Sequence, residues 1–251
     1  MRMKKMTVRE KAILAGLYLS KFDEEGLACL GFTSFRQAFN AIGLALNGKP
    51  ASVKNYRDEF DPVFSNPRKG WRNRAMREHC RDIYERYDHM ELADFSNLLR
   101  RAILGHGISS LEIPVIPENM GKTDTSFAKR LITGQAAERY FQSCYREIEI
   151  FTGMKIEDTT MLGCGFDFHL YSPNLSYGVE VKGISGPSGK ISLTNKEHSV
   201  AAQWGSRYFL FVAKNFQETP TYDLFQDPLG GELQFGRVER KIVEISWSTK
   251  V

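Results

Sequence analysis

Two short segments in the second half of the chain, residues 165–169 and 178–183, carry the side chains best suited to chemistry. Each alternates apolar and polar residues, the pattern that predicts a β-strand with one buried face. Asp167 falls on the polar face of the first segment, and Glu180 and Lys182 share the polar face of the second. If the two strands pair, two carboxylates and one ammonium group converge. Such a group could hold a hard divalent cation and orient a water for hydrolysis of a phosphodiester.

Each of these residues has a distinct expected role. Asp167 and Glu180 offer the oxygen ligands that Mg²⁺ prefers, with Mn²⁺ as a substitute, and the cation keeps waters of its own. The carbonyl of Val181 lies between the two polar residues of the second strand and could complete the metal shell. The Lys182 ammonium could steady the attacking water or the charge that develops on the phosphorus oxygens. Glu138, in a predicted helix, could reach the sheet edge as a further catalytic carboxylate.

The elements around these residues predict an α/β arrangement. A long helix is expected over 126–151, followed by a strand near 155–160 and then by the two strands described above. The capping-box pattern at 194–197 predicts a helix ending at Gly205, and residues 208–212 read as a strand buried on both faces. A further strand, such as 241–247, is expected near the end. In the long helix, apolar residues at steps of four and three predict one buried stripe: Ala137, Phe141, Cys144, Ile148 and Phe151.

The first half of the chain has helical patterns instead. Helices are expected over 7–18, 34–46, 52–61, 71–87 and 91–104, with a tight break at 47–50. The stretch 105–124 is rich in Gly, Pro and Ser, which favours a domain boundary there. We therefore expect a helical domain over 1–110 and an α-β-β-β-α-β core with a mixed sheet over 111–251.

Charge is unevenly distributed, and the basic half indicates a polyanionic partner. Residues 1–105 hold 19 Lys and Arg against 13 Asp and Glu, a net charge of +6, whereas residues 106–251 hold 15 against 17, a net charge of −2. The helices at 34–46 and 52–61 resemble a helix-turn-helix, and arginines crowd the segment around Trp71. The alternative is a plain helical bundle with a solvated basic face. The residues expected to contact DNA are Lys54, Asn55, Arg57, Arg68, Lys69, Arg72, Arg74 and Arg77.

Composition narrows the class of protein. No apolar run approaches membrane-spanning length, and the N-terminal segment lacks the apolar middle region of a signal peptide, so a cytoplasmic protein with no membrane partner is expected. The four cysteines are scattered and include no Cys-x-x-Cys pair, which argues against a disulfide framework or a zinc site.

The motif residues and the element order resemble the PD-(D/E)xK phosphodiesterase superfamily, the fold of most restriction endonucleases. Asp167 is followed after twelve residues by Glu180-Val181-Lys182, and Gly134-x-x-x-Glu138 looks like the acidic helix motif of many members. More narrowly, residues 165–167, 180–183 and 191–197 look like the nuclease-like domain named after the C-terminus of the plant protein NO VEIN. One departure is that Phe166, not proline, precedes the aspartate.

The resemblance implies a Mg²⁺-dependent type II restriction endonuclease that cuts double-stranded DNA. One active site per chain and two strands to cut suggest a homodimer. Two alternatives stay open. One is another nuclease of the same fold, such as a modification-dependent or repair enzyme with an aromatic cage for a flipped base. The other is a DNA-binding regulator with an inactive nuclease core.

Overall fold

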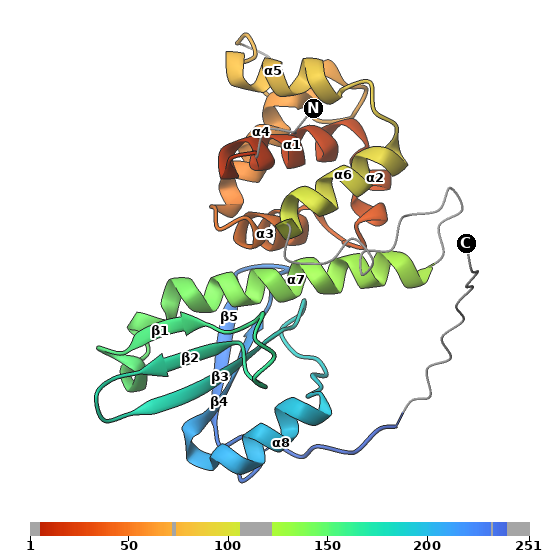
Figure 1. Cartoon of the computed structure of the whole chain (residues 1–251). Helices are drawn as coiled ribbons and strands as arrows, with labels where there is room; N and C mark the ends of the chain where they lie inside the picture. Colours follow the sequence, from red (N-terminus) through yellow and green to blue (C-terminus); the bar gives the residue numbers. More distant parts are fainter. Residues whose placement is uncertain (1–5, 72–73, 106–121, 232, 240–251) are drawn as a thin grey trace, which may run out of the picture.

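The structure is a computed structural model that describes residues 6–71, 74–105, 122–231 and 233–239 (Figure 1). It has the expected α/β architecture, a helical half followed by a five-stranded mixed sheet with helices. The strand expected over 241–247 and most of the expected domain boundary lie outside the described residues. The helical half contains α1 (Val8–Lys21), α2 (Asp23–Cys29), α3 (Phe35–Ala45), α4 (Pro50–Phe60), α5 (Glu78–Tyr87) and α6 (Leu92–Leu104).

Side-chain caps begin two of these helices where the sequence predicts them. The Glu10 carboxylate accepts a hydrogen bond from the Thr7 amide at 2.7 Å, and the Thr7 hydroxyl accepts one from the Glu10 amide at 3.2 Å. The Ser34 hydroxyl accepts from the Gln37 amide at the start of α3. At the other end of the helical half, α6 stops at Gly105, whose φ of 71° is readily adopted by glycine.

Two expected helix starts are wrong. The helix expected from residue 52 begins at Pro50 with Lys49 as its N-cap, because proline at the first helical position has its φ already set for a helix. The helix expected from Trp71 begins only at Glu78. Trp71 instead lies against α4, where its amide donates to the Asp58 carbonyl. Gly70 adopts a φ of +50° beside that carbonyl.

The second half begins with the long helix α7 (Lys122–Cys144), which ends earlier than expected. Two 3₁₀ turns, Tyr145–Glu147 and Glu149–Phe151, take the place of its predicted last turns. The predicted stripe is nevertheless buried along its whole length. A 3₁₀ turn also brings residues three apart to one side, so Ile148 and Phe151 still face the core.

The sheet has the strand order β1-β2-β3-β4-β5. Strands β1, β2 and β3 pair antiparallel. Strands β3 and β4, which are connected in sequence through helix α8, pair parallel, and β5 is antiparallel to β4. The order α7-β1-β2-β3-α8-β4 is the predicted core. The ranges are β1 (Lys155–Asp158), β2 (Phe168–Tyr171), β3 (Ser176–Gly183), α8 (Asn195–Trp204), β4 (Tyr208–Lys214) and β5 (Thr221–Gln226).

Helix α7 lies between the helical half and the sheet, and α8 covers the other side of the sheet (Figure 1). On the sheet side, the Phe141 ring lies 5.2 Å from that of Phe168 and 4.9 Å from that of Phe211. On the helical side, the Gln135 amide donates to the carbonyls of Ala45 and Ile103 at 2.7 and 2.9 Å. One apolar core therefore runs through both halves, and their separation into two domains stays a prediction.

Candidate active site

The predicted convergence of Asp167 with β3 is present in the structure. Asp167 directly precedes β2, and its amide donates at 3.0 Å to the carbonyl of Val179, the residue that pairs with Phe168. Its Oδ2 accepts from the Val181 amide at 2.8 Å. This second hydrogen bond fixes the carboxylate against the strand that carries Glu180 and Lys182.

The turn before Asp167 is shaped by close packing. Gly165 has a φ of +97°, and a Cβ there would lie 2.7 Å from Cγ2 of Val200 in α8. The Tyr208 hydroxyl donates to the Gly165 carbonyl at 2.9 Å. Phe166, the residue that departs from the superfamily motif, has its ring centroid 4.9 Å from that of Trp204 in a tilted arrangement and packs over Gly178. The phenylalanine thus supplies packing between the sheet and α8 at this position.

Lys182 is held between two carboxylates. Its Nζ donates to Glu180 Oε1 at 2.5 Å and to Glu197 Oε2 at 2.9 Å. The same Glu197 oxygen accepts from the Thr194 amide at 2.9 Å, as half of the capping box that begins α8. The helix cap therefore also positions the lysine. Sequence reasoning recognised this capping box but missed the contact of Glu197 with the candidate catalytic group.

Burial and crowding make the carboxylates of this group hard to ionise. Removal from water raises the pKa of Glu180 to about 8, and the charges of Asp167 and Glu197 add to the effect. Removal from water likewise raises the pKa of Asp167 to about 6 and that of Glu138 to about 7. Burial opposes the charge of Lys182, but Glu180 and Glu197 raise its pKa overall. Lys182 is therefore the cation that partly neutralises this acidic group.

These side chains line a cleft of about 610 Å³ between α7, β3 and the start of α8. Glu138, Asp167, Glu180, Val181 and Lys182 all border it, so the residues expected to act together are brought together. Among the described residues, no set of three or more His, Cys, Asp and Glu side chains has the arrangement of a ready metal site. The oxygen donors nevertheless suit Mg²⁺, because a cation there would favour the ionised carboxylates, which burial and then the neighbouring acids disfavour.

The arginines expected to contact DNA lie instead in ion pairs with acids of the helical half. Arg57 is 9% exposed, and its guanidinium bonds Asp58 at 2.6 Å. Arg68 bonds Asp61 at 3.0 Å and also pairs with Asp23. These contacts favour a structural role, and DNA binding by the two arginines stays a prediction.

The same holds for the next two arginines. Glu59, 5% exposed, pairs with Arg74 at 2.6 Å and with Arg77 at 2.5 Å. Of the remaining candidates, Lys54 pairs with Asp58 but is half exposed, and Asn55 and Lys69 are exposed. Arg72 lies outside the described residues. The expected basic surface is therefore smaller than its count of arginines suggests.

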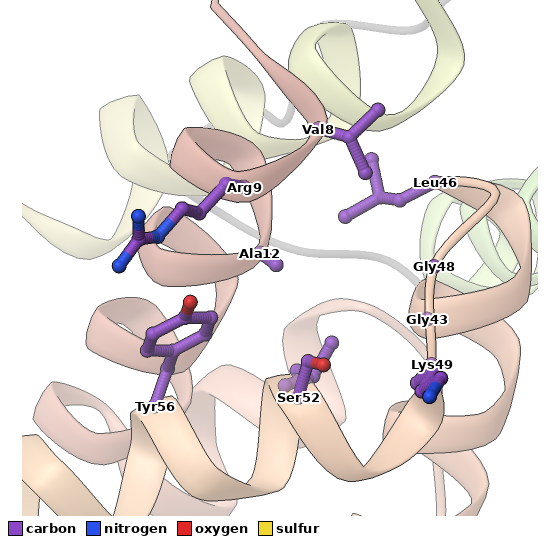
Figure 2. Close-up of a pocket in the computed structure, with 10 residues that line it drawn as sticks. Val8, Arg9, Ala12, Gly43, Leu46, Gly48, Lys49, Ser52 and Tyr56 are labelled. Atoms are coloured by element: carbon purple, nitrogen blue, oxygen red, sulfur yellow. The ribbon is translucent and has the colours of Figure 1, made fainter.

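The start of α4 faces a second cavity, of about 320 Å³, that it forms with α1 and the end of α3 (Figure 2). Val8 and Leu46 stand on one side of this cavity, with Tyr56 and Ser52 on the other. Tyr56 is the one aromatic residue among the described residues that line it. It is not the aromatic cage that would favour a base-flipping enzyme. Helices α3 and α4 are joined by a short turn as predicted, and a DNA-reading role for the pair stays a prediction.

The fold and the cleft together define an α/β domain with a carboxylate-lysine group at the junction of two antiparallel strands. Residues 137–225 match the family model described as Protein NO VEIN, C-terminal, a family linked to PD-(D/E)xK-like nuclease domains. The match runs from the middle of α7 nearly to the end of β5 and covers less than half of the chain. No curated protein and no solved structure matches the chain significantly. In the described residues, no helix is both long and apolar enough to cross a membrane.

Proposed function

We propose that this protein is a Mg²⁺-dependent endonuclease that hydrolyses phosphodiester bonds in double-stranded DNA, as a type II restriction enzyme does. The observation that carries the proposal is the convergence of Asp167, Glu180 and Lys182 in one cleft, with Glu138 facing them from α7. Two carboxylates and a lysine are the side chains that this reaction needs. The match to the NO VEIN C-terminal model over the same residues supports it.

Each residue has a role that its surroundings support. Asp167 and Glu180, with the carbonyl of Val181, would hold Mg²⁺ or Mn²⁺. When bound, the cation supplies Lewis acidity and lowers the pKa of a water molecule that attacks phosphorus. Lys182 directs its ammonium at the oxygens on which negative charge develops. Glu138, with a pKa of about 7, can accept or return a proton near neutral pH.

Two strands must be cut, and each chain provides one such cleft, so the proposed working form is a homodimer. The two rival functions give different outcomes in one assay. A modification-dependent enzyme would cleave only methylated or otherwise modified DNA. A regulator with an inactive core would bind DNA without cleaving it under any metal condition.

The test is cleavage of unmodified, mixed-sequence plasmid DNA with Mg²⁺, with Mn²⁺ and with EDTA. The wild-type protein should produce discrete fragments only with metal. Asp167→Asn should abolish cleavage, and Lys182→Met should lower the single-turnover rate by roughly 100-fold or more, because it removes charge stabilisation from the transition state. Asp82→Asn and Lys155→Met, which change exposed residues away from the cleft, are the matched controls. Wild-type rates in both cleft variants would refute the assignment.

A further inference from the structure

Three cations that are free to meet a polyanion lie at the mouth of the candidate active-site cleft. Lys129 and Arg130 of α7, and Lys190 of the loop between β3 and α8, all line that cleft. None of the three forms an ion pair with a carboxylate within the part of the chain that the structure describes. Arg130 and Lys190 are exposed, and Lys129 is half-buried. Arg68 and Arg77, in contrast, are each held in an ion pair with a buried carboxylate.

Helix α7 arranges these groups along one face. Lys129 and Thr133 are four residues apart, as are Arg130, Gly134 and Glu138, so both rows run along the side of the helix that borders the cleft. A rise of about 1.5 Å per residue places Lys129 about 14 Å from the level of Glu138. Phosphates of one DNA strand advance by about 3.4 Å along the duplex axis, so this face spans roughly four of them.

A hydroxyl group on this face lacks a partner. Thr133 is 5% exposed, and its Oγ1 has no hydrogen-bond partner among the described residues, although the residue lines the cleft. A buried polar atom normally has a partner, so an orphaned one next to a cleft indicates a place that a ligand or water fills. A phosphate oxygen can accept the hydrogen bond that this hydroxyl offers.

The helix face is also open between the cations and the acids. A Cβ built on Gly134 would meet nothing within 4 Å. Because Gly134 lies between Arg130 and Glu138 in the same row, no side chain separates the mouth of the cleft from its acidic floor on that row. A nucleic-acid backbone could therefore approach the helix closely at this point.

We infer that Lys129, Arg130, Lys190 and the Thr133 hydroxyl form a phosphate-binding rim that seats the DNA backbone over the carboxylates. This inference rests on the proposed nuclease function and locates its substrate contacts. The rim attracts the backbone, whereas the carboxylates of the floor are left to hold the metal. Lys129, Arg130 and Thr133 precede the segment that matches the NO VEIN C-terminal model, so the match does not itself assign them a role.

The test compares two triple variants that lose the same charge. The rim variant is Lys129→Gln/Arg130→Gln/Lys190→Gln. The control variant, Arg81→Gln/Arg86→Gln/Arg101→Gln, removes three exposed cations of the helical half instead. Binding to a fluorescein-labelled DNA duplex is followed by anisotropy over a range of salt, with Ca²⁺ in place of Mg²⁺ to slow hydrolysis.

The rim variant should bind on the order of 100-fold more weakly at moderate salt. The slope of log affinity against log salt should be smaller by about 2–3, because fewer counterions are released when fewer phosphates are contacted. The control variant should stay close to wild type. Equal losses in both variants, or a loss in the control variant alone, would overturn the inference and place the DNA on the helical half.

A second pair of variants examines the open helix face. Gly134→Glu introduces a negative side chain where space is free, and Gly134→Ala fills the same position without charge. Both should fold, and Gly134→Glu alone should lose DNA affinity; equal binding by the two would refute the rim on α7. These measurements do not depend on catalysis. DNA bound through the rim but never cut with Mg²⁺ would refute the nuclease proposal alone, whereas unimpaired cleavage by the rim variant would refute the rim alone.

Discussion

Replacing Glu180 by glutamine should stabilise the metal-free protein, and the gain should grow as the pH rises. The folded protein holds the pKa of Glu180 at about 8, well above the ordinary value of 4.5. A carboxyl group with a raised pKa contributes its full stability below the unfolded pKa and loses it as pH rises through the folded value. The pKa values of Asp167 and Glu138, about 6 and 7, act in the same direction. Without metal, the wild-type protein should therefore lose stability between about pH 5 and pH 8.

The size of the gain follows from the pKa difference. In the unfolded chain, pH 7 is about 2.5 units above the pKa of Glu180, so the carboxyl group is ionised there. Keeping it protonated in the folded protein costs up to about 3 kcal/mol of folding stability. Glutamine removes this cost but also weakens the contact with Lys182, which is worth about 1 kcal/mol because Glu197 keeps its hold on the ammonium. The net gain is about 2 kcal/mol at pH 7, or roughly 5 °C in Tm. At pH 5 it should be close to zero.

Urea and thermal unfolding in EDTA between pH 5 and pH 8 measure this gain. Glu85→Gln, which changes an exposed glutamate of α5, is the matched control and should reproduce the wild-type pH dependence. Added Mg²⁺ should stabilise the wild type at pH 8 and have little effect on Glu180→Gln, since the ligand has been removed. A Glu180→Gln protein that is less stable than wild type at pH 8 in EDTA would show that crowding of carboxylates does not set the energetics of the cleft.

Two further predictions concern packing and charge away from the carboxylates. Gly183→Ala should cost about 1–3 kcal/mol in unfolding free energy and reduce DNA cleavage, because a Cβ there lies 2.8 Å from the Thr133 carbonyl and pushes α7 with Glu138 off the sheet. Gly134→Ala is the matched control in urea unfolding, and an equal effect of both would contradict the argument. Arg68→Ala should cost about 2 kcal/mol by leaving the buried Asp61 with fewer partners, yet change DNA affinity little. Arg86→Ala serves as its exposed control, and a large loss of DNA affinity in Arg68→Ala alone would restore the predicted DNA contact.

Several helix starts and stops were predictable from the sequence, because the residues that make a helix cap are close neighbours in the chain. The capping boxes at Thr7 and Thr194 and the glycine stop at Gly105 act within one or two helical turns. Helix α2 was missed because its stability comes from distant packing. Its Gly26 lies against the Tyr18 ring and accepts a hydrogen bond from the Tyr18 hydroxyl at 3.0 Å. No pattern within so short a segment records such a contact.

The candidate site divides in the same way. The strand alternation was enough to place Glu180 and Lys182 on one face, and the expected pairing of the two strands brought Asp167 beside them, where it bonds the Val181 amide. The contact of Glu197 with Lys182 required the three-dimensional return of α8 over the sheet. The pairing of the arginines with acids was hidden for a similar reason. A count of charges gives no information about which arginine lies beside which carboxylate.

Two buried glutamates show why the cleft, and not the arginine-rich segment, is the better candidate for chemistry. Glu59 and Glu180 are 5% and 3% exposed, so both lose almost all contact with water. Around Glu59, hydrogen bonds and charge from Arg77, with Arg74 nearby, overcome the effect of burial and lower the pKa. Around Glu180, Lys182 is shared with Glu197 and other carboxylates lie close, so the pKa rises.

If stability alone mattered, we would expect both buried glutamates to be neutralised by neighbouring arginines, as Glu59 is. An acid left without sufficient compensation is costly to keep, and such groups gather where a ligand supplies the missing charge. The helical half surrounds its buried Glu59 with arginines. The cleft has one lysine among its buried acids and, within the described residues, cations without ion pairs at its rim. The proposed ligand, a metal ion together with a phosphate backbone, would satisfy both.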